Sequence, residues 1–305
     1  MALENKRWIE ISVLAERGSV DDLMGLFSRY CPGGAAMEEL RHKPDLPAAE
    51  RVVVKGFIDE NDQETLQKVD IALLLLSRTG AISEPRTRLL EPEDWAEAWK
   101  AFFPPLPIGE RLVIVPTWVD YTPAPERVPL YLDPGMAFGT GLHATTRLCL
   151  IALERLLEPE LSILDCGTGS GILAIAAVLL GASHVDAIDT DPVSVEVARE
   201  NSVLNHVSER ISVMQGTLPG RSTPRVPLFE GGPYDLLLIN ILAEVIIDLA
   251  PTLQDYLVTG GRCVASGIIA EKADAVRDAL QDHGLDVSEQ LDEDGWVALV
   301  AQKRS

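Results

Sequence analysis

The sequence is poor in cysteine, and its four cysteines lie far apart, at positions 31, 149, 166 and 263. None forms a C-x-x-C pair, and no histidine cluster lies near any of them. This spacing argues against a zinc site and against the dense disulfide framework of a small secreted domain. We therefore expect buried free thiols, a reducing compartment and no metal site.

Long apolar runs are absent as well. The longest, residues 71–76 and 171–182, are too short to span a bilayer, and the N-terminal residues lack the apolar segment of a signal peptide. These absences predict a cytoplasmic protein without membrane contact. The sequence also lacks a G-x-S-x-G elbow, a phosphate loop with G-K-S/T and an H-E-x-x-H helix. The common serine hydrolase, P-loop and zinc protease classes are therefore not indicated.

Basic side chains are scarce relative to acidic ones: 26 Lys and Arg face 47 Asp and Glu, for a formal net charge of −21. Most of the excess lies in residues 131–305, which carry 11 basic and 25 acidic side chains. Nucleic acids and anionic membranes are bound largely through Lys and Arg, so neither is expected as the main partner. A basic partner, or a small molecule in a sheltered cleft, suits this charge better. A monomer is the favoured oligomeric state.

The length of 305 residues predicts two domains. Over residues 1–90 the patterns predict two helices and four strands: helices at 20–30 and 61–78, and strands at 8–14, 35–40, 51–58 and 82–90. This βαββαβ order predicts a small α+β domain of the ferredoxin-like kind. A helix that stops at Pro104 and Pro105 is expected to link it, as residues 91–104, to a second domain over residues 105–305.

The second domain is predicted to alternate strands with helices. Strands are expected at 161–166, 185–189, 210–214, 234–240, 262–266, 286–290 and 295–300, and helices at 145–157, 172–180, 192–204, 242–257 and 271–283. This alternation predicts an α/β fold with a doubly wound, mostly parallel sheet. The turn over 291–294 is so short that the last two strands must form a hairpin, with the final strand antiparallel. A seven-stranded sheet that ends in an antiparallel hairpin differs from the sheet of a dinucleotide-binding Rossmann domain.

A glycine-rich segment, I-L-D-C-G-T-G-S-G (163–171), joins the first of these strands to the next helix. Glycine at 167 and 169 lets the backbone approach a ligand closely, and the helix start offers unpaired N–H groups. The competing interpretation is a tight turn without a ligand. Asp189 ends the following strand, where its carboxylate can accept hydrogen bonds from both ribose hydroxyls of an adenosine ligand. Asp191 precedes Pro192 and is interpreted as a helix cap rather than as half of a metal site.

Two further segments carry candidate site residues. Asn240 ends an apolar strand beside the expected cleft, and its amide can both donate and accept hydrogen bonds; a helix cap is the alternative. Residues 133–146 combine glycines, an aromatic and hydroxyls before a helix, which is typical of a loop that folds over a site. Thr146 is placed to reach a ligand there. His143 is interpreted as a packed or capping residue rather than a base.

These segments resemble the bacterial ribosomal protein L11 methyltransferases, the PrmA family. The resemblance rests on seven runs: W-A-E-A-W-K (95–100), G-E-R-L-V-I-V-P (109–116), D-P-G-M-A-F-G-T-G-L-H-A-T-T (133–146), I-L-D-C-G-T-G-S-G-I-L-A-I-A-A (163–177), I-D-T-D-P (188–192), N-I-L-A (240–243) and E-D-G-W-V (293–297). It is strong over residues 92–302 and thin before them.

The resemblance implies a class I methyltransferase fold that binds S-adenosyl-L-methionine, with cofactor contacts at Thr146, Gly167, Asp189 and Asn240. It places Asn240 where related amine methyltransferases hold the acceptor nitrogen, which makes this amide the candidate catalytic, amine-orienting residue. It further implies that lysine side chains and the N-terminal amine of a basic ribosomal protein, L11, are methylated, with the N-terminal domain recognising that substrate.

The sequence departs from the family pattern at Leu142 and Ala144, in a long Pro- and Gly-rich insertion over 216–233, and across the first 90 residues. Three alternatives stay open: a methyltransferase of another protein or a small amine, a nicotinamide-dependent oxidoreductase, and a non-catalytic RNA-binding module. The terminal hairpin and N-I-L-A argue against the oxidoreductase. The acidic charge and the absence of ribonucleoprotein aromatic motifs argue against RNA binding.

Overall fold

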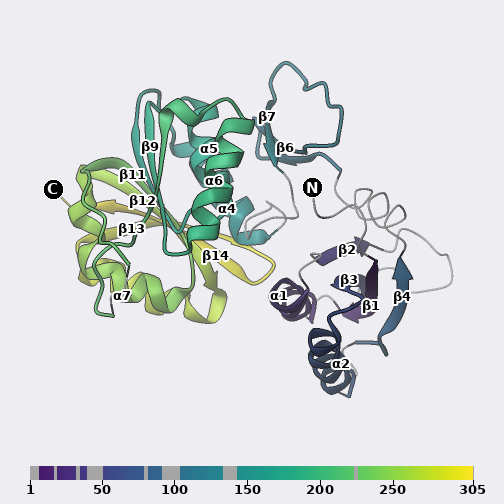
Figure 1. Cartoon of the computed structure of the whole chain (residues 1–305). Coiled ribbons are helices and arrows are strands. Elements are labelled where there is room, and N and C mark those ends of the chain that lie inside the picture. The colour runs from purple at the N-terminus through teal and green to yellow at the C-terminus, as the bar shows by residue number, and fades with distance from the viewer. Residues whose placement is uncertain are drawn as a thin grey trace. The chain divides into compact units, whose positions relative to one another are not determined.

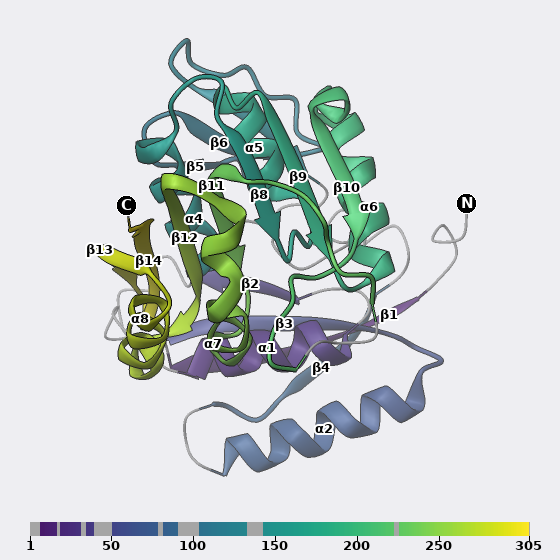
Figure 2. The same cartoon turned by 90° about the vertical axis from the view of Figure 1, so that its left-hand side faces the viewer.

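The computed structural model describes residues 7–16, 19–31, 35–39, 51–78, 82–90, 104–132, 143–222 and 226–304. The chain divides into two compact units, Met1–Pro104 and Pro105–Ser305 (Figures 1 and 2). In the described parts of the chain, no helix is long and apolar enough to cross a membrane. The predicted linker helix over 91–104 lies outside the described residues, apart from Pro104.

The first unit has the predicted ferredoxin-like order. Its elements are β1 (Trp8–Glu16), α1 (Val20–Tyr30), β2 (Ala35–Glu39), β3 (Arg51–Asp59), α2 (Gln63–Ser77) and β4 (Arg86–Leu90). The sheet order is β2-β3-β1-β4, with every neighbouring pair antiparallel. Alternate residues of β1, among them Ile11 and Val13, pack with Phe27 of α1 and Leu73 of α2, so both helices cover one face. The strand predicted over 82–90 is shorter than expected: Ile82 makes only an isolated bridge to Ala15.

The second unit begins with a small sheet that the sequence patterns did not predict. It contains β5 (Leu106–Ile108), β6 (Leu112–Pro116) and β7 (Val128–Leu132), in the order β5-β6-β7. Every residue of β6 is buried, so its apolar run shows no alternation from which a strand face could be inferred. The guanidinium of Arg127 donates to the carbonyls of Ile108, Gly109 and Leu112 and ties the ends of the three strands together.

The main sheet of this unit has seven strands in the order β10-β9-β8-β11-β12-β14-β13. The strands are β8 (Ser162–Cys166), β9 (His184–Asp189), β10 (Ile211–Gln215), β11 (Tyr234–Asn240), β12 (Leu257–Ile269), β13 (Leu285–Glu293) and β14 (Trp296–Lys303). Strand β14 is antiparallel to both of its neighbours, whereas the other pairs are parallel. The predicted doubly wound sheet with a terminal antiparallel hairpin is confirmed.

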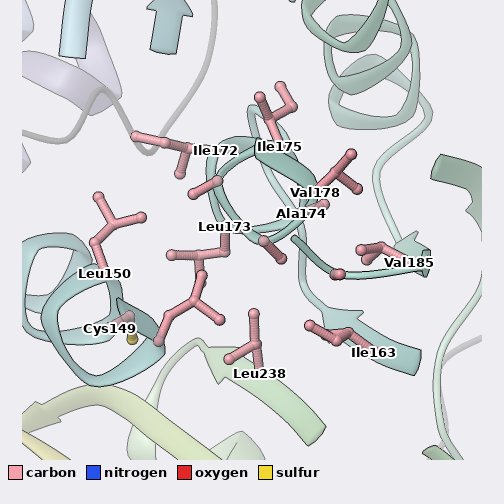
Figure 3. Close-up of a cluster of buried hydrophobic side chains, with 14 of the residues drawn as sticks. Cys149, Leu150, Ile163, Ile172, Leu173, Ala174, Ile175, Val178, Val185 and Leu238 are labelled. Atoms are coloured by element: carbon pink, nitrogen blue, oxygen red, sulfur yellow. The ribbon is translucent and has the colours of Figure 1, made fainter. Parts of the chain in front are cut away.

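Two layers of helices enclose this sheet. They are α4 (Ala144–Leu156), α5 (Ile172–Leu180), α6 (Pro192–Leu204), α7 (Ala243–Leu253) and α8 (Ala273–Asp282). On one face, Ile163 and Leu238 pack with α4, α5 and α6; on the other, Leu164 and Leu237 pack with α7 and α8. Figure 3 shows part of the first cluster around α5, between Leu150 of α4 and Ile163 and Leu238 of the sheet. Consecutive residues of a strand therefore pack against helices on opposite faces of the sheet. Because both faces are buried, these strands consist of continuous apolar runs.

Several predicted boundaries in this unit were wrong. Strands β13 and β14 both end three residues later than predicted, and two other elements differ more. The helix expected over 242–257 ends at Leu253 and continues only as a short 3₁₀ turn, Gln254–Tyr256. Strand β12 has 13 residues instead of the five expected, because Leu257 already pairs with Tyr234 before a register shift. The local pattern concealed this early pairing, since Gly260 and Gly261 within the strand are typical of a turn.

The Pro- and Gly-rich segment over 216–233 is tied to the fold at several points. Thr217 donates to the carbonyl of Pro227 and accepts from the amide of Phe229. On α7, the hydroxyl of Thr252 donates to the carbonyl of Pro219 at 2.6 Å, and the carboxylate of Asp248 accepts from the amide of Ser222 at 3.1 Å. The described part of this segment is therefore held against α7.

All four cysteines are buried free thiols, as predicted. Burial raises the pKa of Cys31 and of Cys263 to about 12, so these thiols stay protonated at neutral pH.

Candidate active site at the carboxyl edge of the sheet

The carboxyl ends of β8, β9 and β11 meet at one edge of the seven-stranded sheet. The chain passes from β8 to β9 on one side, whereas β11 lies on the other side of β8. This change of direction is the switch point at which open α/β sheets bind ligands, because the two flanking connections leave in opposite directions. The predicted residues Gly167, Asp189 and Asn240 follow or end these three strands.

The turn after β8 depends on its glycines. The amides of Gly167 and Thr168 both donate to the carbonyl of Ile188, at 2.8 and 3.0 Å, which fixes the turn to the end of β9. Gly167 has a φ of +79°, and a Cβ added there would lie 2.4 Å from Cγ2 of Ile241. Only glycine accepts both this conformation and the close approach of the segment after β11.

A buried carboxylate lies beneath this turn. Oδ2 of Asp165 accepts a hydrogen bond from the hydroxyl of Thr168 at 2.6 Å, and Asp165 is fully buried. Burial raises the pKa of Asp165 to about 7, against the opposing hydrogen bonds from Thr168 and the amide of Ala174. The sequence patterns did not single out Asp165, which appeared there only as part of the glycine-rich motif.

Asp189 is joined to the same turn. Its Oδ2 accepts from the amide of Gly169 at 2.9 Å, and its Oδ1 accepts from the amide of Asp191 at 3.0 Å. Since an ionised carboxylate offers about four acceptor positions, capacity remains for a ligand. Asp191 caps α6 by accepting from the amide of Val193 at 2.9 Å, as predicted. Among the described residues, no group of His, Cys, Asp and Glu side chains has the arrangement of a metal site.

Thr146 and Asn240 come together at this edge, although 94 residues separate them. Nδ2 of Asn240 donates to Oγ1 of Thr146 at 3.5 Å, and Thr146 is buried in the first turn of α4. Helix α7 has Leu242 at its N-cap, so the alternative interpretation of Asn240 as a helix cap was wrong. Asn240 is half-buried, while its neighbour Leu242 is exposed beside it.

His143 caps α4, as predicted. Its Nδ1 accepts from the amide of Thr145 at 3.3 Å and also makes a 2.8 Å hydrogen bond with the Thr145 hydroxyl. Its ring packs edge-on against Trp296, with ring centroids 4.7 Å apart. Next to Thr146, Arg147 pairs with Glu293. These contacts were missed, because the only signal for them in the sequence was the E-D-G-W-V run. Residues 133–142 of the predicted loop lie outside the described residues.

The family model described as ribosomal protein L11 methyltransferase (PrmA) matches residues 7–304. The chain belongs to this family. The match begins at residue 7, so the family likeness, which the sequence motifs carried only from residue 92, extends through the first unit. Membership in a methyltransferase family also excludes the alternative interpretation of the chain as a nicotinamide-dependent oxidoreductase.

Two relatives align with nearly the whole chain, and a solved structure aligns with two thirds of it. The ribosomal protein L11 methyltransferase of Chloroflexus aurantiacus is 40% identical, over 99% of both chains. The one from Symbiobacterium thermophilum is 41% identical, over 97% of this chain and 99% of its own. The solved structure of ribosomal protein L11 methylase from Lactobacillus delbrueckii subsp. bulgaricus is 33% identical, with a TM-score of 0.58, covering 66% of this chain and 99% of that one. The class I methyltransferase fold is thereby confirmed.

The cofactor of this fold and family is S-adenosyl-L-methionine, and the residues at the carboxyl edge fit its chemistry. The glycine turn after β8 presents backbone without side chains, Asp189 is an acceptor suited to ribose hydroxyls, and the Thr146–Asn240 pair is polar. Ile241, whose side chain lies close to Gly167, adds an apolar group at this edge. The edge therefore offers separate polar and apolar contacts to a nucleoside with a charged sulfonium.

Proposed function

We propose that this chain transfers methyl groups from S-adenosyl-L-methionine to lysine side chains and to the N-terminal amine of ribosomal protein L11. The observation that carries this proposal is the hydrogen bond of Asn240 to Thr146 beside the Gly167 turn, at the switch point of the sheet. The chain that forms this sheet belongs to the PrmA family. The names of the relatives support L11 as the substrate.

Four residues would hold the cofactor. Asp189 would accept hydrogen bonds from the ribose hydroxyls, and the Gly167 turn would let the backbone approach the rest of the cofactor. Thr146 and Asn240 would contact it from the other side of the switch point. When bound, S-adenosyl-L-methionine supplies a methyl carbon that its sulfonium already activates.

The protein then has to position and desolvate a neutral amine. Such positioning can lower a barrier by roughly 7–11 kcal/mol. Because Nδ2 of Asn240 is engaged by Thr146, its Oδ1 is the atom that would accept a hydrogen bond from the substrate amine and orient its lone pair. A lysine amine with an ordinary pKa of about 10.4 loses its proton more readily in a low-dielectric cleft, and water would take that proton.

The two units would divide this task. Residues 1–90 would recognise the substrate, residues 91–104 would link the units, and residues 105–305 would carry the chemistry. The net charge of −21 favours a basic protein over nucleic acid or a membrane as partner, and we infer a cytoplasmic monomer. Methylation of L11 should therefore lose efficiency as ionic strength rises, while cofactor affinity changes little.

Mass spectrometry of purified L11 tests the proposal most simply. Incubation with the chain and S-adenosyl-L-methionine should add methyl groups to lysines and to the N-terminal amine. Asn240→Ala should slow transfer by about 100-fold, since the amine loses its orienting acceptor. Transfer that is undiminished in Asn240→Ala, with cofactor affinity intact, would contradict the orienting role. Methylation of a different protein or of a small amine, but not of L11, would contradict the substrate.

A further inference from the structure

The turn between β13 and β14 lies at the same edge of the sheet as the candidate site. Strand β14 is antiparallel to both β12 and β13, so β13 runs in the direction of the parallel strands. Its last residue, Glu293, therefore lies at the carboxyl edge. Asp294 and Gly295 form the turn, with φ values of +51° and +81°, and Trp296 begins β14. None of the roles proposed above uses this turn.

An ion pair connects the turn to α4. Nε and Nη2 of Arg147 both approach Oε1 of Glu293, at 2.9 and 2.8 Å, and Asp294 lies 3.6 Å from Nη2. The two side chains of the main pair are 22% and 34% exposed. A double contact to one carboxylate, largely out of solvent, restricts the geometry more than a single exposed pair does.

An aromatic contact connects the turn to α4 a second time. The ring of Trp296 packs against the ring of His143 with an interplanar angle of 70°. The turn is itself anchored, since the carbonyl of Gly295 accepts from the amide of Ala270 at 2.9 Å. The carbonyl of His143 in turn accepts from the amides of Thr146 and Arg147. The two contacts thus lie on either side of Thr146 within one helical turn.

A second ion pair provides an internal comparison. Arg155 of α4 pairs with Glu289 of β13 at 3.0 Å, two turns further along the same helix. Its side chains are 58% and 44% exposed. Both pairs join the same two elements and involve the same two residue types. Only the Arg147 pair adjoins a residue of the candidate site.

We propose that the turn formed by Glu293, Asp294, Gly295 and Trp296 positions the first turn of α4, and through it the Thr146 hydroxyl, for cofactor binding. Glu293 is a positioning residue that acts through Arg147. That this positioning matters for methyl transfer rests on the proposed function. The positioning of α4 itself is a property of the chain alone, so the two parts of the proposal can fail separately.

The test compares Glu293→Gln with Glu289→Gln in the full chain. Hydrogen exchange of the Thr146 and Arg147 amides, measured without cofactor, should become faster in Glu293→Gln and stay at the wild-type rate in Glu289→Gln. Calorimetry should show affinity for S-adenosylhomocysteine reduced by about three- to tenfold in Glu293→Gln and by less than about twofold in Glu289→Gln. Arg147→Lys, which keeps the charge but offers one contact, should fall between wild type and Arg147→Met.

Three outcomes would overturn the proposal. One is equal amide exchange in the two Glu variants. Another is equal affinity of Glu293→Gln and Glu289→Gln for S-adenosylhomocysteine. The third is that the effects of Arg147→Met and Glu293→Gln on affinity for S-adenosylhomocysteine add up in a double-mutant cycle. Residues that act through one another must instead be coupled. If the wild-type chain fails to bind S-adenosylhomocysteine at all, the proposed function fails, whereas the exchange measurement still decides whether the turn positions α4.

Discussion

Strand β11 has one polar side chain, Asp235, next to its start and another, Asn240, at its end, and the two lie in different surroundings. At the amino edge, Oδ2 of Asp235 accepts from the amide and the hydroxyl of Ser162, at 2.8 and 2.7 Å, and fastens β11 to β8. At the carboxyl edge, Asn240 makes a long 3.5 Å contact with Thr146. The carboxylate at the amino edge joins two strands, whereas we propose that the amide at the carboxyl edge contacts a ligand.

Two glycines in the connections before and after α5 show the same contrast. Gly181 follows the helix at the amino edge with a φ of +125°, and a Cβ there would meet no atom within 4 Å. Gly167, before the helix at the carboxyl edge, combines a φ of +79° with the 2.4 Å approach to Ile241. The first glycine ends a helix, and its carbonyl accepts from the amide of Glu160. The second also brings together two segments of the candidate site.

The largest effect is expected from Gly167→Ala. The new methyl group collides with Ile241 and should push the segment after β11 away, reducing affinity for S-adenosylhomocysteine by about 100-fold in calorimetry. Gly181→Ala is the matched control. It imposes an unfavourable φ without a collision, so it should lower the melting temperature and leave affinity unchanged. Equal losses of affinity in the two variants would remove the distinction between the edges.

A smaller effect is expected from Asp189→Asn. Loss of a charged acceptor for the ribose hydroxyls should weaken cofactor binding by about 10- to 100-fold, the range of a charge-assisted hydrogen bond. Asp235→Asn removes a carboxylate at the other edge and should reduce stability while affinity stays within about twofold. Equilibrium binding and urea unfolding of both variants measure these effects. Weak binding by Asp235→Asn would show that the two edges are not independent.

Thr146→Val should have a still smaller effect. Valine preserves the shape of the buried side chain but cannot accept the hydrogen bond from Asn240, which should reduce the rate of methyl transfer by about three- to tenfold. Because the contact is neutral and long, a loss beyond about 100-fold would indicate that Thr146 takes part in the reaction more directly. Steady-state kinetics with purified L11 separates the effect on the rate from that on KM.

An effect of a different kind, on stability rather than on binding or rate, is expected in how the free energy of unfolding depends on pH. Burial raises the pKa of Asp165 from 3.8 to about 7. Between these values the folded chain keeps the proton that the unfolded chain has lost, so Asp165 lowers the free energy of unfolding as pH rises. Asp165→Asn cannot ionise, so its free energy of unfolding should fall less between about pH 5 and pH 7.5. Parallel curves for variant and wild type in urea unfolding would contradict this.

Local patterns predicted most elements and the site residues that end strands. Helices α1, α5 and α6 have the expected bounds, because caps such as Asp191 and Gly181 mark them in the sequence. Asp189 and Asn240 could be placed at the same edge from the sequence because a parallel sheet gathers its carboxyl ends there. The contact of Thr146 with Asn240 and that of Arg147 with Glu293 join distant parts of the chain, and no local pattern encodes them.

The comparison between the edges is tested most directly by mapping S-adenosylhomocysteine onto the chain through amide chemical shifts. Shifts are expected at the turn around Gly167 and Gly169, at Asp189 and at Asn240, with Ser162, Gly181 and Asp235 unchanged. Shifts at the amino edge, or none at the carboxyl edge despite binding, would contradict it.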